Sequence, residues 1–242
     1  ARPRGGQRGA RVPCPPVTIT APDGTGTRAR VEFGIDSFAE AVTDLSGRRL
    51  SDAESLRRTV DAAVLAESVG IDIFSVGEHY RWEFLDSAPA VILAGIAGRT
   101  ARIRLGTSVT VLSTQDPVRV FHEFSTLNAI SGGRAQLIVG RGSSIDSFPL
   151  FGYDLTDYED LFEEKLELWV KLIRERPVTW SGRTRPPLSD QTLYPVLETD
   201  TLPTWVGVGG SPNSVIRAAR HNLPLMLAVI GGDPLRFAGH VD

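Results

Sequence analysis

Short apolar segments alternate with amphipathic segments along most of the chain. From Val31 onward, runs rich in Val, Ile and Phe are separated by stretches whose apolar residues recur at helical spacing. A repeated alternation of strand and helix predicts a parallel sheet. The six predicted strands have the sequences RVEFGIDSF, IDIFSVGEH, IRLGTSVTVL, RAQLIVGRG, TWVGVGG and LPLMLAVIGG.

Two of the segments between these strands carry clear signals for the start of a helix. Segment 117–130 follows Asp116, has a proline at its first position and stops at Ser-Gly-Gly. Segment 157–175 follows Thr156, and Thr156 and Glu159 stand at capping-box spacing. We therefore expect an amphipathic helix in each segment.

Six strand–helix units indicate a barrel that is incomplete in this chain. A (β/α)8 barrel takes about 250 residues for eight units, and the connections at 143–155 and 176–203 are long. The alternative is a doubly wound open sheet, which usually has a glycine-rich phosphate loop after its first strand. FGIDSFAEAV has no such loop, so the sequence predicts a TIM (β/α)8-type α/β barrel domain over 31–242.

Residues 1–30 differ in composition from the rest. They are rich in Arg, Pro and Gly and have no hydrophobic period, so they bury too little apolar surface to offset the entropy of ordering. We expect a disordered tail over 1–30, or a start of translation at Val31.

Charge, cysteine content and hydropathy narrow the class of protein. The net charge is -3, and because six arginines lie in 1–30 the remainder is more acidic still, which disfavours a nucleic-acid partner. Cys14 is the single cysteine, so no intrachain disulfide forms and a reducing cytoplasm fits. No apolar run approaches the roughly 18–20 residues that span a bilayer. These features predict a cytoplasmic protein without a membrane partner.

The residues at the predicted strand ends are the candidates for chemistry, because the strand C-termini form the active face of such barrels. The polar residues there are Asp36, Ser37, Glu78, His79, Thr107, Ser108, Arg141, Ser143, Ser144, Ser211 and Ser214. Both lysines, Lys165 and Lys171, lie within the predicted long helix, which excludes Schiff-base chemistry at a strand end. The four histidines lack the spacing of metal ligands, which disfavours a metal site. GVGGSP lacks the last glycine of the GxGxxG dinucleotide-binding fingerprint, so that motif is not supported.

The segment GVGGSPNSVIRAAR at 207–220 is the clearest candidate for an anion site. Ser211 suits an N-cap, Pro212 suits the first helical position and Ser214 adds a hydroxyl in the first turn. Free N–H groups and the helix dipole favour a phosphate there, unless Ser-Pro merely starts a helix. Arg141, between two glycines in VGRGSS at the preceding strand end, could close on the same anion while those glycines let it approach.

His79, in GEHY at the end of the second strand, is the candidate acid or base. Its unperturbed pKa suits proton transfer near neutral pH. The alternative is a histidine that only caps a neighbouring loop.

Two segments carry a resemblance to a known family. They are LGTSVTVLSTQDPVRVFHEFSTLNAISGGRAQLIVGRG at 105–142 and FGYDLTDYEDLFEEKLEL at 151–168. The chain resembles the bacterial luciferase-like flavin monooxygenases, which are (β/α)8 barrels. The resemblance implies that the phosphate of flavin mononucleotide (FMN) is held by Arg141, by backbone near Ser143, and by the loop with Gly210, Ser211 and Ser214. It also implies a non-proline cis peptide between Ser108 and Val109, and a catalytic role for His79.

The chain departs from the family pattern in three places. Tyr80 stands where the family often has a second histidine, which argues against assuming that the substrate is luciferase's own aldehyde. Glu159 occupies the position at which luciferase has a second arginine that contacts the phosphate, so that contact is expected to be absent. Family members continue for roughly another hundred residues past the position of Asp242, so strands that complete the barrel are expected to be missing.

The resemblance implies a flavin-dependent monooxygenase that uses reduced FMN and O2 to oxidise a small organic substrate. A separate NAD(P)H flavin reductase and a homodimer are the expected partners. One alternative is a hydride-transfer oxidoreductase that uses FMN or a deazaflavin. Another is a flavin-binding protein without catalysis, or an inactive fragment. The substrate and its pathway cannot be read from the sequence.

Overall fold

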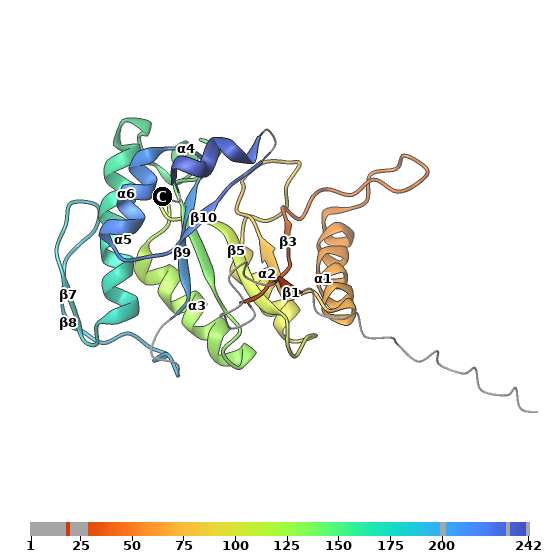
Figure 1. The fold of residues 1–242 in the computed structure, drawn as a ribbon, viewed down its shortest axis with the longest axis horizontal. Helices are drawn as coiled ribbons and strands as arrows, with labels where there is room; N and C mark the ends of the chain where they lie inside the picture. The colour runs from red at the N-terminus through yellow and green to blue at the C-terminus, as the bar shows by residue number, and fades with distance from the viewer. Residues whose placement is uncertain (1–17, 20–28, 199–201, 231–232, 241–242) are drawn as a thin grey trace, which may run out of the picture.

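The described part of the chain is built around one parallel sheet. The computed structural model describes residues 18–19, 29–198, 202–230 and 233–240. Six parallel strands pair in the order β10-β9-β6-β5-β4-β3 (Figure 1). These strands are β3 (Gly34–Ser37), β4 (Ile73–Val76), β5 (Arg104–Val111), β6 (Leu137–Gly140), β9 (Thr204–Val208) and β10 (Leu225–Leu227). Each lies in one of the six predicted strand segments, and the curled sheet confirms the predicted incomplete barrel.

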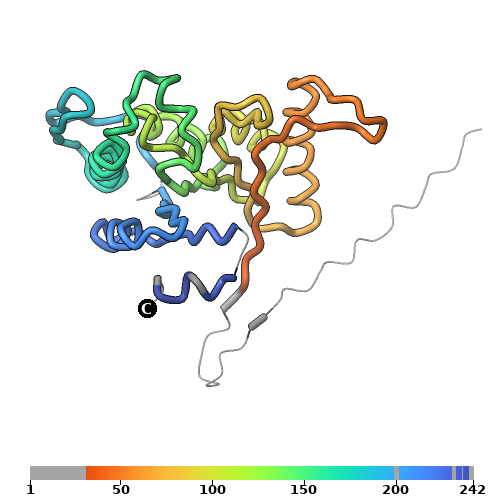
Figure 2. The backbone as a smooth tube through the Cα atoms, turned by 90° about the horizontal axis from the view of Figure 1, so that it is seen from above, coloured from red at the N-terminus to blue at the C-terminus, as the bar shows by residue number. Residues whose placement is uncertain are grey.

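Helices cover the outer face of the sheet. The longer ones are α1 (Asp52–Val69), α2 (Pro89–Ala97), α3 (Pro117–Ser131), α5 (Tyr158–Arg174) and α6 (Pro212–Arg220). The short helices α4 (Ser147–Phe151), η1 (Leu155–Asp157) and η2 (Pro234–His240) lie in connections and at the last described segment. Figure 2 shows the longer helices following one another around the outside of the curled sheet.

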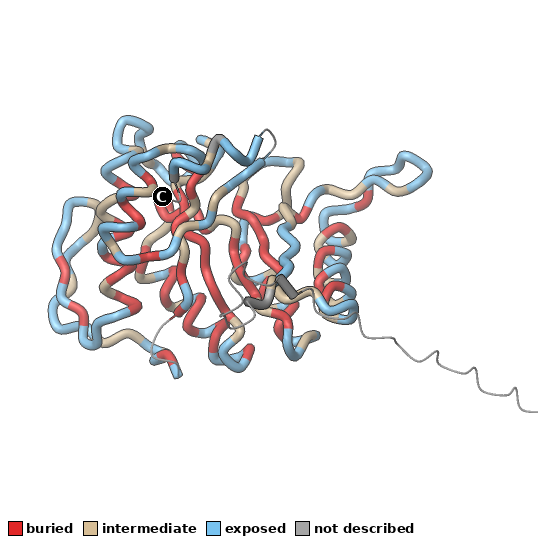
Figure 3. The backbone as a smooth tube through the Cα atoms, viewed as in Figure 1, coloured by how far each residue is buried: buried red, intermediate tan, exposed pale blue. Residues whose placement is uncertain are grey.

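The two faces of the sheet have different side chains because a strand alternates its side chains with period two. Phe74, Leu105, Leu137 and Val206, from four adjacent strands, are buried in one hydrophobic cluster with residues of the helices. Figure 3 shows the buried segments concentrated along these central strands and the helix sides that face them. The helices therefore pack on the outer face of these strands. The residues that alternate with this buried set face the inside of the curled sheet.

The helix that follows β5 begins and ends as its sequence predicts. The Asp116 carboxylate accepts hydrogen bonds from the N–H groups of Val118 at 2.8 Å and Arg119 at 3.3 Å. Gly132 ends the helix with φ at +68°, a left-handed conformation that glycine adopts without a steric penalty. The predicted helix 117–130 is confirmed as Pro117–Ser131.

The predicted capping box at the start of α5 is wrong, although the helix itself is confirmed. Thr156 lies in η1, where its N–H donates to the Asp154 carboxylate at 2.8 Å and its hydroxyl donates to the same oxygen at 2.9 Å. This local Asx turn takes the hydrogen bonds that the box needs. Glu159 turns away from the helix start and pairs with Arg141.

Two antiparallel pairs lie outside the main sheet. Strands β7 (Val178–Trp180) and β8 (Leu188–Gln191) pair within the connection 176–203, where the sequence pattern predicted no strand. Strands β1 (Thr18–Ile19) and β2 (Ala29–Arg30) pair within the predicted tail. The rest of 1–30 lies outside the described residues, so the disordered tail stays a prediction. None of the described helices is long and apolar enough to cross a membrane.

Candidate functional site

The ends of β3 to β6 and of β9 bring the sequence-predicted residues to one edge of the sheet. The register of β6 on β9 pairs Val139 with Val206, so Arg141 and the loop before α6 follow neighbouring strand ends. His79 follows β4, two strands from β6. The predicted phosphate residues and the predicted acid or base therefore belong to the same edge.

Arg141 is held by groups from two other segments, helix α5 and the turn after β5. Its guanidinium pairs with the Glu159 carboxylate of α5 and lies 5.1 Å over the ring of Tyr158. The Ser113 hydroxyl donates to the Arg141 carbonyl oxygen at 3.4 Å. The arginine side chain is 22% exposed, so the guanidinium is fixed in place and still reaches the surface. Ser143, two residues further on, is exposed.

The loop before α6 has the predicted helix start. Ser211 is the N-cap residue, with φ at -85° and ψ at 120°, and Pro212 takes the first helical position. The Ser211 hydroxyl makes no capping hydrogen bond, which leaves it available to a ligand. Gly210 has φ at +110°, and a Cβ there would meet no atom within 4 Å. Ser214 is only 3% exposed, so its hydroxyl is less accessible than the sequence suggested.

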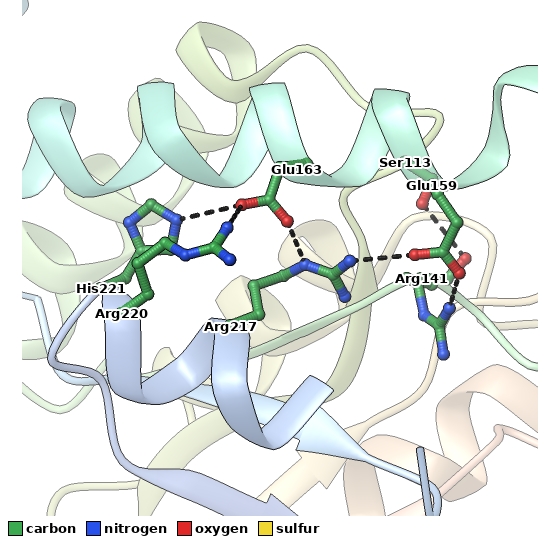
Figure 4. A network of polar contacts seen from close by, with 7 residues as sticks. All are labelled: Ser113, Arg141, Glu159, Glu163, Arg217, Arg220 and His221. Atoms are coloured by element: carbon green, nitrogen blue, oxygen red, sulfur yellow. Dashed lines mark hydrogen bonds and ion pairs between the residues drawn. The ribbon is translucent and has the colours of Figure 1, made fainter. Parts of the chain in front are cut away.

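A network of ion pairs joins Arg141 to helix α6 (Figure 4). The second oxygen of Glu159 accepts a hydrogen bond from Arg217 Nη2 at 2.9 Å. Glu163, one turn further along α5, pairs with Arg217 Nε and with Arg220 Nη1. The sequence did not predict a role for Arg217 at this site. The sequence contains two glutamates four positions apart in α5 and two arginines three positions apart in α6. Their pairing could not be predicted, because it depends on the packing of α5 against α6.

The His79 ring is oriented by a second residue that the sequence analysis missed. His79 Nδ1 lies 2.9 Å from Asp86 Oδ2, and the His79 backbone N–H donates to Asp86 Oδ1 at 3.0 Å. Asp86 is fully buried. The rings of Phe38 and Phe84 lie 4.5 Å and 4.9 Å from the imidazole ring. A carboxylate on Nδ1 fixes the tautomer and leaves Nε2 for proton transfer.

Asp36 adds a second titratable group close to His79. Its carboxylate accepts a hydrogen bond from the Ser108 side chain. Burial of the carboxyl group raises its pKa to about 6 in spite of that bond, and the charge of Asp86 acts in the same direction. Asp36 belongs to the edge strand β3, and the residue as a whole is exposed although its carboxyl group is partly buried.

Tyr80, which replaces a family histidine, binds a buried carboxylate. Its hydroxyl donates to Glu78 Oε1 at 2.6 Å, and the other Glu78 oxygen accepts from the Val111 N–H at 2.9 Å. Glu78 is 4% exposed, and burial raises its pKa. Gln115 Nε2 also donates to Glu78, at 3.0 Å. These bonds tie the end of β4 to the end of β5.

The peptide bond between Ser108 and Val109 is cis, as the resemblance implies. The Val109 side chain packs against a glycine of the neighbouring strand β6 and a glycine of β9, one strand further along the sheet. A Cβ on Gly140 would lie 2.8 Å from Val109 Cγ2, and a Cβ on Gly207 would lie 3.0 Å from Val109 Cγ1. From the sequence, the glycine before Arg141 was interpreted as allowing close approach of a ligand. That interpretation is corrected, because Gly140 makes room for Val109.

The residues at this edge fit an anionic group such as the phosphate of FMN. They supply a guanidinium, an uncapped hydroxyl, and the first-turn N–H groups of a nine-residue helix. Arg217 Nη1 is buried and has no hydrogen-bond partner among the described residues. The described residues contain no group of three or more His, Cys, Asp or Glu side chains that could hold a metal.

A cavity lies beside these residues. It has a volume of about 470 Å³ and is lined mainly by residues of α2 and α3, together with Glu78 and Thr110. Neither His79 nor Arg141 lines it. Because the chemistry-bearing side chains lie at the strand ends, we assign the candidate site to that edge and not to the cavity.

Known proteins share the sequence pattern and the fold. The alkanal monooxygenase alpha chain of Photorhabdus luminescens is 31% identical over 192 residues, which cover 75% of this chain and 50% of that protein. An F420-dependent glucose-6-phosphate dehydrogenase of Kineococcus radiotolerans is 31% identical over 161 residues, which cover 63% and 47%. The chain thus spans about half the length of these curated relatives.

A solved structure shows the same fold. The oxygenating constituent of 3,6-diketocamphane monooxygenase from Pseudomonas putida, in complex with FMN, superposes with a TM-score of 0.64 at 22% identity, over 81% of this chain and 57% of that one. Similar proteins therefore bind FMN or the deazaflavin F420. The model of the luciferase-like monooxygenases matches residues 32–240, and the chain belongs to this family.

Proposed function

We propose that the chain is an FMN-dependent monooxygenase that uses reduced FMN and O2 to oxidise a small organic substrate. The observation that carries the proposal is that residues suited to bind an anion and a histidine suited to transfer a proton lie at the same end of the sheet. Arg141 and the start of α6 follow adjacent strands, and the His79–Asp86 pair follows β4 at the same edge of the sheet. A reductase that supplies the reduced flavin and a second copy of the chain are proposed partners.

The phosphate of FMN would be held by Arg141, by the Ser211 hydroxyl and by the N–H groups at the start of α6. A guanidinium forms paired, charge-assisted hydrogen bonds with phosphate oxygens. Backbone near Ser143 and the open space at Gly210 would admit the tail. Ser108 and Val109 of β5, which lies between β4 and β6, would support the ring.

Bound FMN would supply the electrons that activate oxygen; the protein would supply orientation and proton control. Nε2 of His79 would hold or move a proton, since Asp86 occupies Nδ1. The rings of Phe38 and Phe84 flank the imidazole and would exclude water from it.

A second candidate is a hydride-transfer oxidoreductase that uses F420. The relative named F420-dependent glucose-6-phosphate dehydrogenase favours it, and a phosphate anchor alone does not separate the two cofactors. A flavin-binding protein without catalysis is the third candidate.

Titration with each cofactor, followed by a test of oxygen consumption, separates these candidates. We expect the purified chain to bind FMN in preference to F420, and to consume O2 in a reaction that depends on reduced FMN and an organic substrate. Turnover with reduced F420 in the absence of oxygen would overturn the monooxygenase assignment. FMN binding without oxygen-dependent product formation for any tested substrate would support the non-catalytic candidate.

A further inference from the structure

Glu159 of α5 is shared between two arginines that come from different parts of the fold. One carboxylate oxygen pairs with Arg141 Nη1 at the end of β6, and the other accepts from Arg217 Nη2 of α6 at 2.9 Å. The Glu159 side chain is 55% exposed, whereas those of Arg141 and Arg217 are 22% and 7% exposed. The Glu159 side chain is thus more exposed than either arginine that it contacts. Figure 4 shows its carboxylate joined to both guanidinium groups.

Arg217 has contacts that do not depend on Glu159. Its Nε pairs with Glu163, and its guanidinium lies 5.3 Å over the ring of Phe162. Glu163 also holds Arg220 Nη1 at 2.8 Å and lies 3.8 Å from His221 Nε2. Within this network three guanidinium groups face two carboxylates, so the network carries an excess of positive charge that an added anion can reduce.

We propose that Glu159 is an internal competitor for the phosphate group at Arg141. It binds the guanidinium when no phosphate is present, and an incoming phosphate displaces it. This inference rests on the proposed function, because it concerns the same anchor. A carboxylate and a phosphate that share one guanidinium repel each other, and the exchange therefore lowers the affinity for phosphate.

The exchange does not leave a buried charge without a partner. When Arg141 turns to a phosphate, the second oxygen of Glu159 remains hydrogen-bonded to Arg217. More than half of the Glu159 side chain already contacts water, which lowers the cost of moving it. A flavin held in this way exchanges readily between the protein and solution. A cofactor that a separate reductase delivers requires such exchange.

The test is the affinity of Glu159→Gln for FMN and for riboflavin, which lacks the phosphate, measured by flavin fluorescence at low and high salt. Removing one negative charge beside a phosphate is expected to tighten FMN binding by about tenfold at low salt, and by less at high salt. Riboflavin binding is expected to stay unchanged. Glu163→Gln is the matched control, because Glu163 binds Arg217 but not Arg141; its FMN affinity is expected to stay within about twofold of the parent.

Two outcomes overturn the proposal: FMN affinity that falls in Glu159→Gln, or FMN affinity that stays the same. Either would make Glu159 a residue that only positions Arg141. Glu159→Ala serves the same test if the glutamine variant fails to fold, as judged by circular dichroism. If the parent binds neither flavin, the proposed function fails, and the same comparison is made by calorimetry with inorganic phosphate. Tighter phosphate binding in Glu159→Gln would then support the competitor role, and unchanged binding would reject it.

Discussion

The His79 ring contacts a buried carboxylate: Nδ1 is 2.9 Å from Asp86 Oδ2, and Asp86 has no exposed surface. The two residues are seven positions apart, and the backbone N–H of His79 binds the other oxygen of Asp86 at 3.0 Å. Asp86 therefore fixes both the main chain and the ring of His79. Because Nδ1 is engaged, Nε2 is the nitrogen that the proposed proton transfer would use.

Asp86→Asn is expected to lower turnover by roughly 10²-fold while FMN affinity changes little. The amide preserves the shape but no longer stabilises a protonated imidazole, and general acid–base catalysis is worth roughly 10²–10⁴-fold. The measurement is the turnover number at saturating flavin beside a flavin titration. Unchanged turnover in a folded variant would show that the pair has only a structural role.

Asp36→Asn is expected to make stability less dependent on pH. The folded-state pKa of Asp36 is raised to about 6, so the stability linked to its protonated form is present at pH 4 and is lost as the pH rises through 6. The neutral amide avoids that loss. Thermal unfolding between pH 4 and pH 8 is therefore expected to show that the stability of the variant increases relative to that of the parent as the pH rises. A stability difference that does not change with pH would contradict the raised pKa.

Lys165→Met is expected to destabilise the fold by about 1–3 kcal/mol, because it leaves a buried carbonyl group without its donor. Lys165 Nζ donates to the Ser113 carbonyl at 2.6 Å and lies 4.1 Å from the centre of the Tyr153 ring. Chemical denaturation measures the change. Lys171→Met, which removes a partly exposed lysine paired with Glu175 at 3.2 Å, is the control and should stay within about 0.5 kcal/mol. Equal effects would reject this account of Lys165.

Gly140→Ala is expected to cost about 1–3 kcal/mol, since its methyl group would lie 2.8 Å from Val109 Cγ2. Val109→Ala in the same chain should restore part of the lost stability. Gly209→Ala is the control, because a Cβ at that position meets no atom within 4 Å. If the Gly140 variant were as stable as the Gly209 variant, Gly140 would not be needed to accommodate Val109.

The local sequence pattern predicted the helices and strands of this fold well. The contacts within the candidate site depend instead on segments that are far apart in the sequence. The six strands and the helix start at Asp116 follow from periodicity and capping chemistry, which depend on neighbours in sequence. The cis bond at Ser108–Val109 came from the resemblance alone, since no local signal marks it. Asp86 and Arg217 were missed because their roles depend on which segments pack together. The capping box at Thr156 failed because Asp154 competes for the same N–H group.

The comparison of FMN with riboflavin in Arg141→Ala tests the central claim most directly. Loss of a charge-assisted contact worth about 1.5–3 kcal/mol is expected to weaken FMN binding by about ten- to a hundredfold. Riboflavin binding should change by less than about twofold, and Arg220→Ala, a residue 61% exposed on α6, should affect neither ligand by more. An equal loss of affinity for both flavins in Arg141→Ala would contradict the claim that Arg141 holds the phosphate.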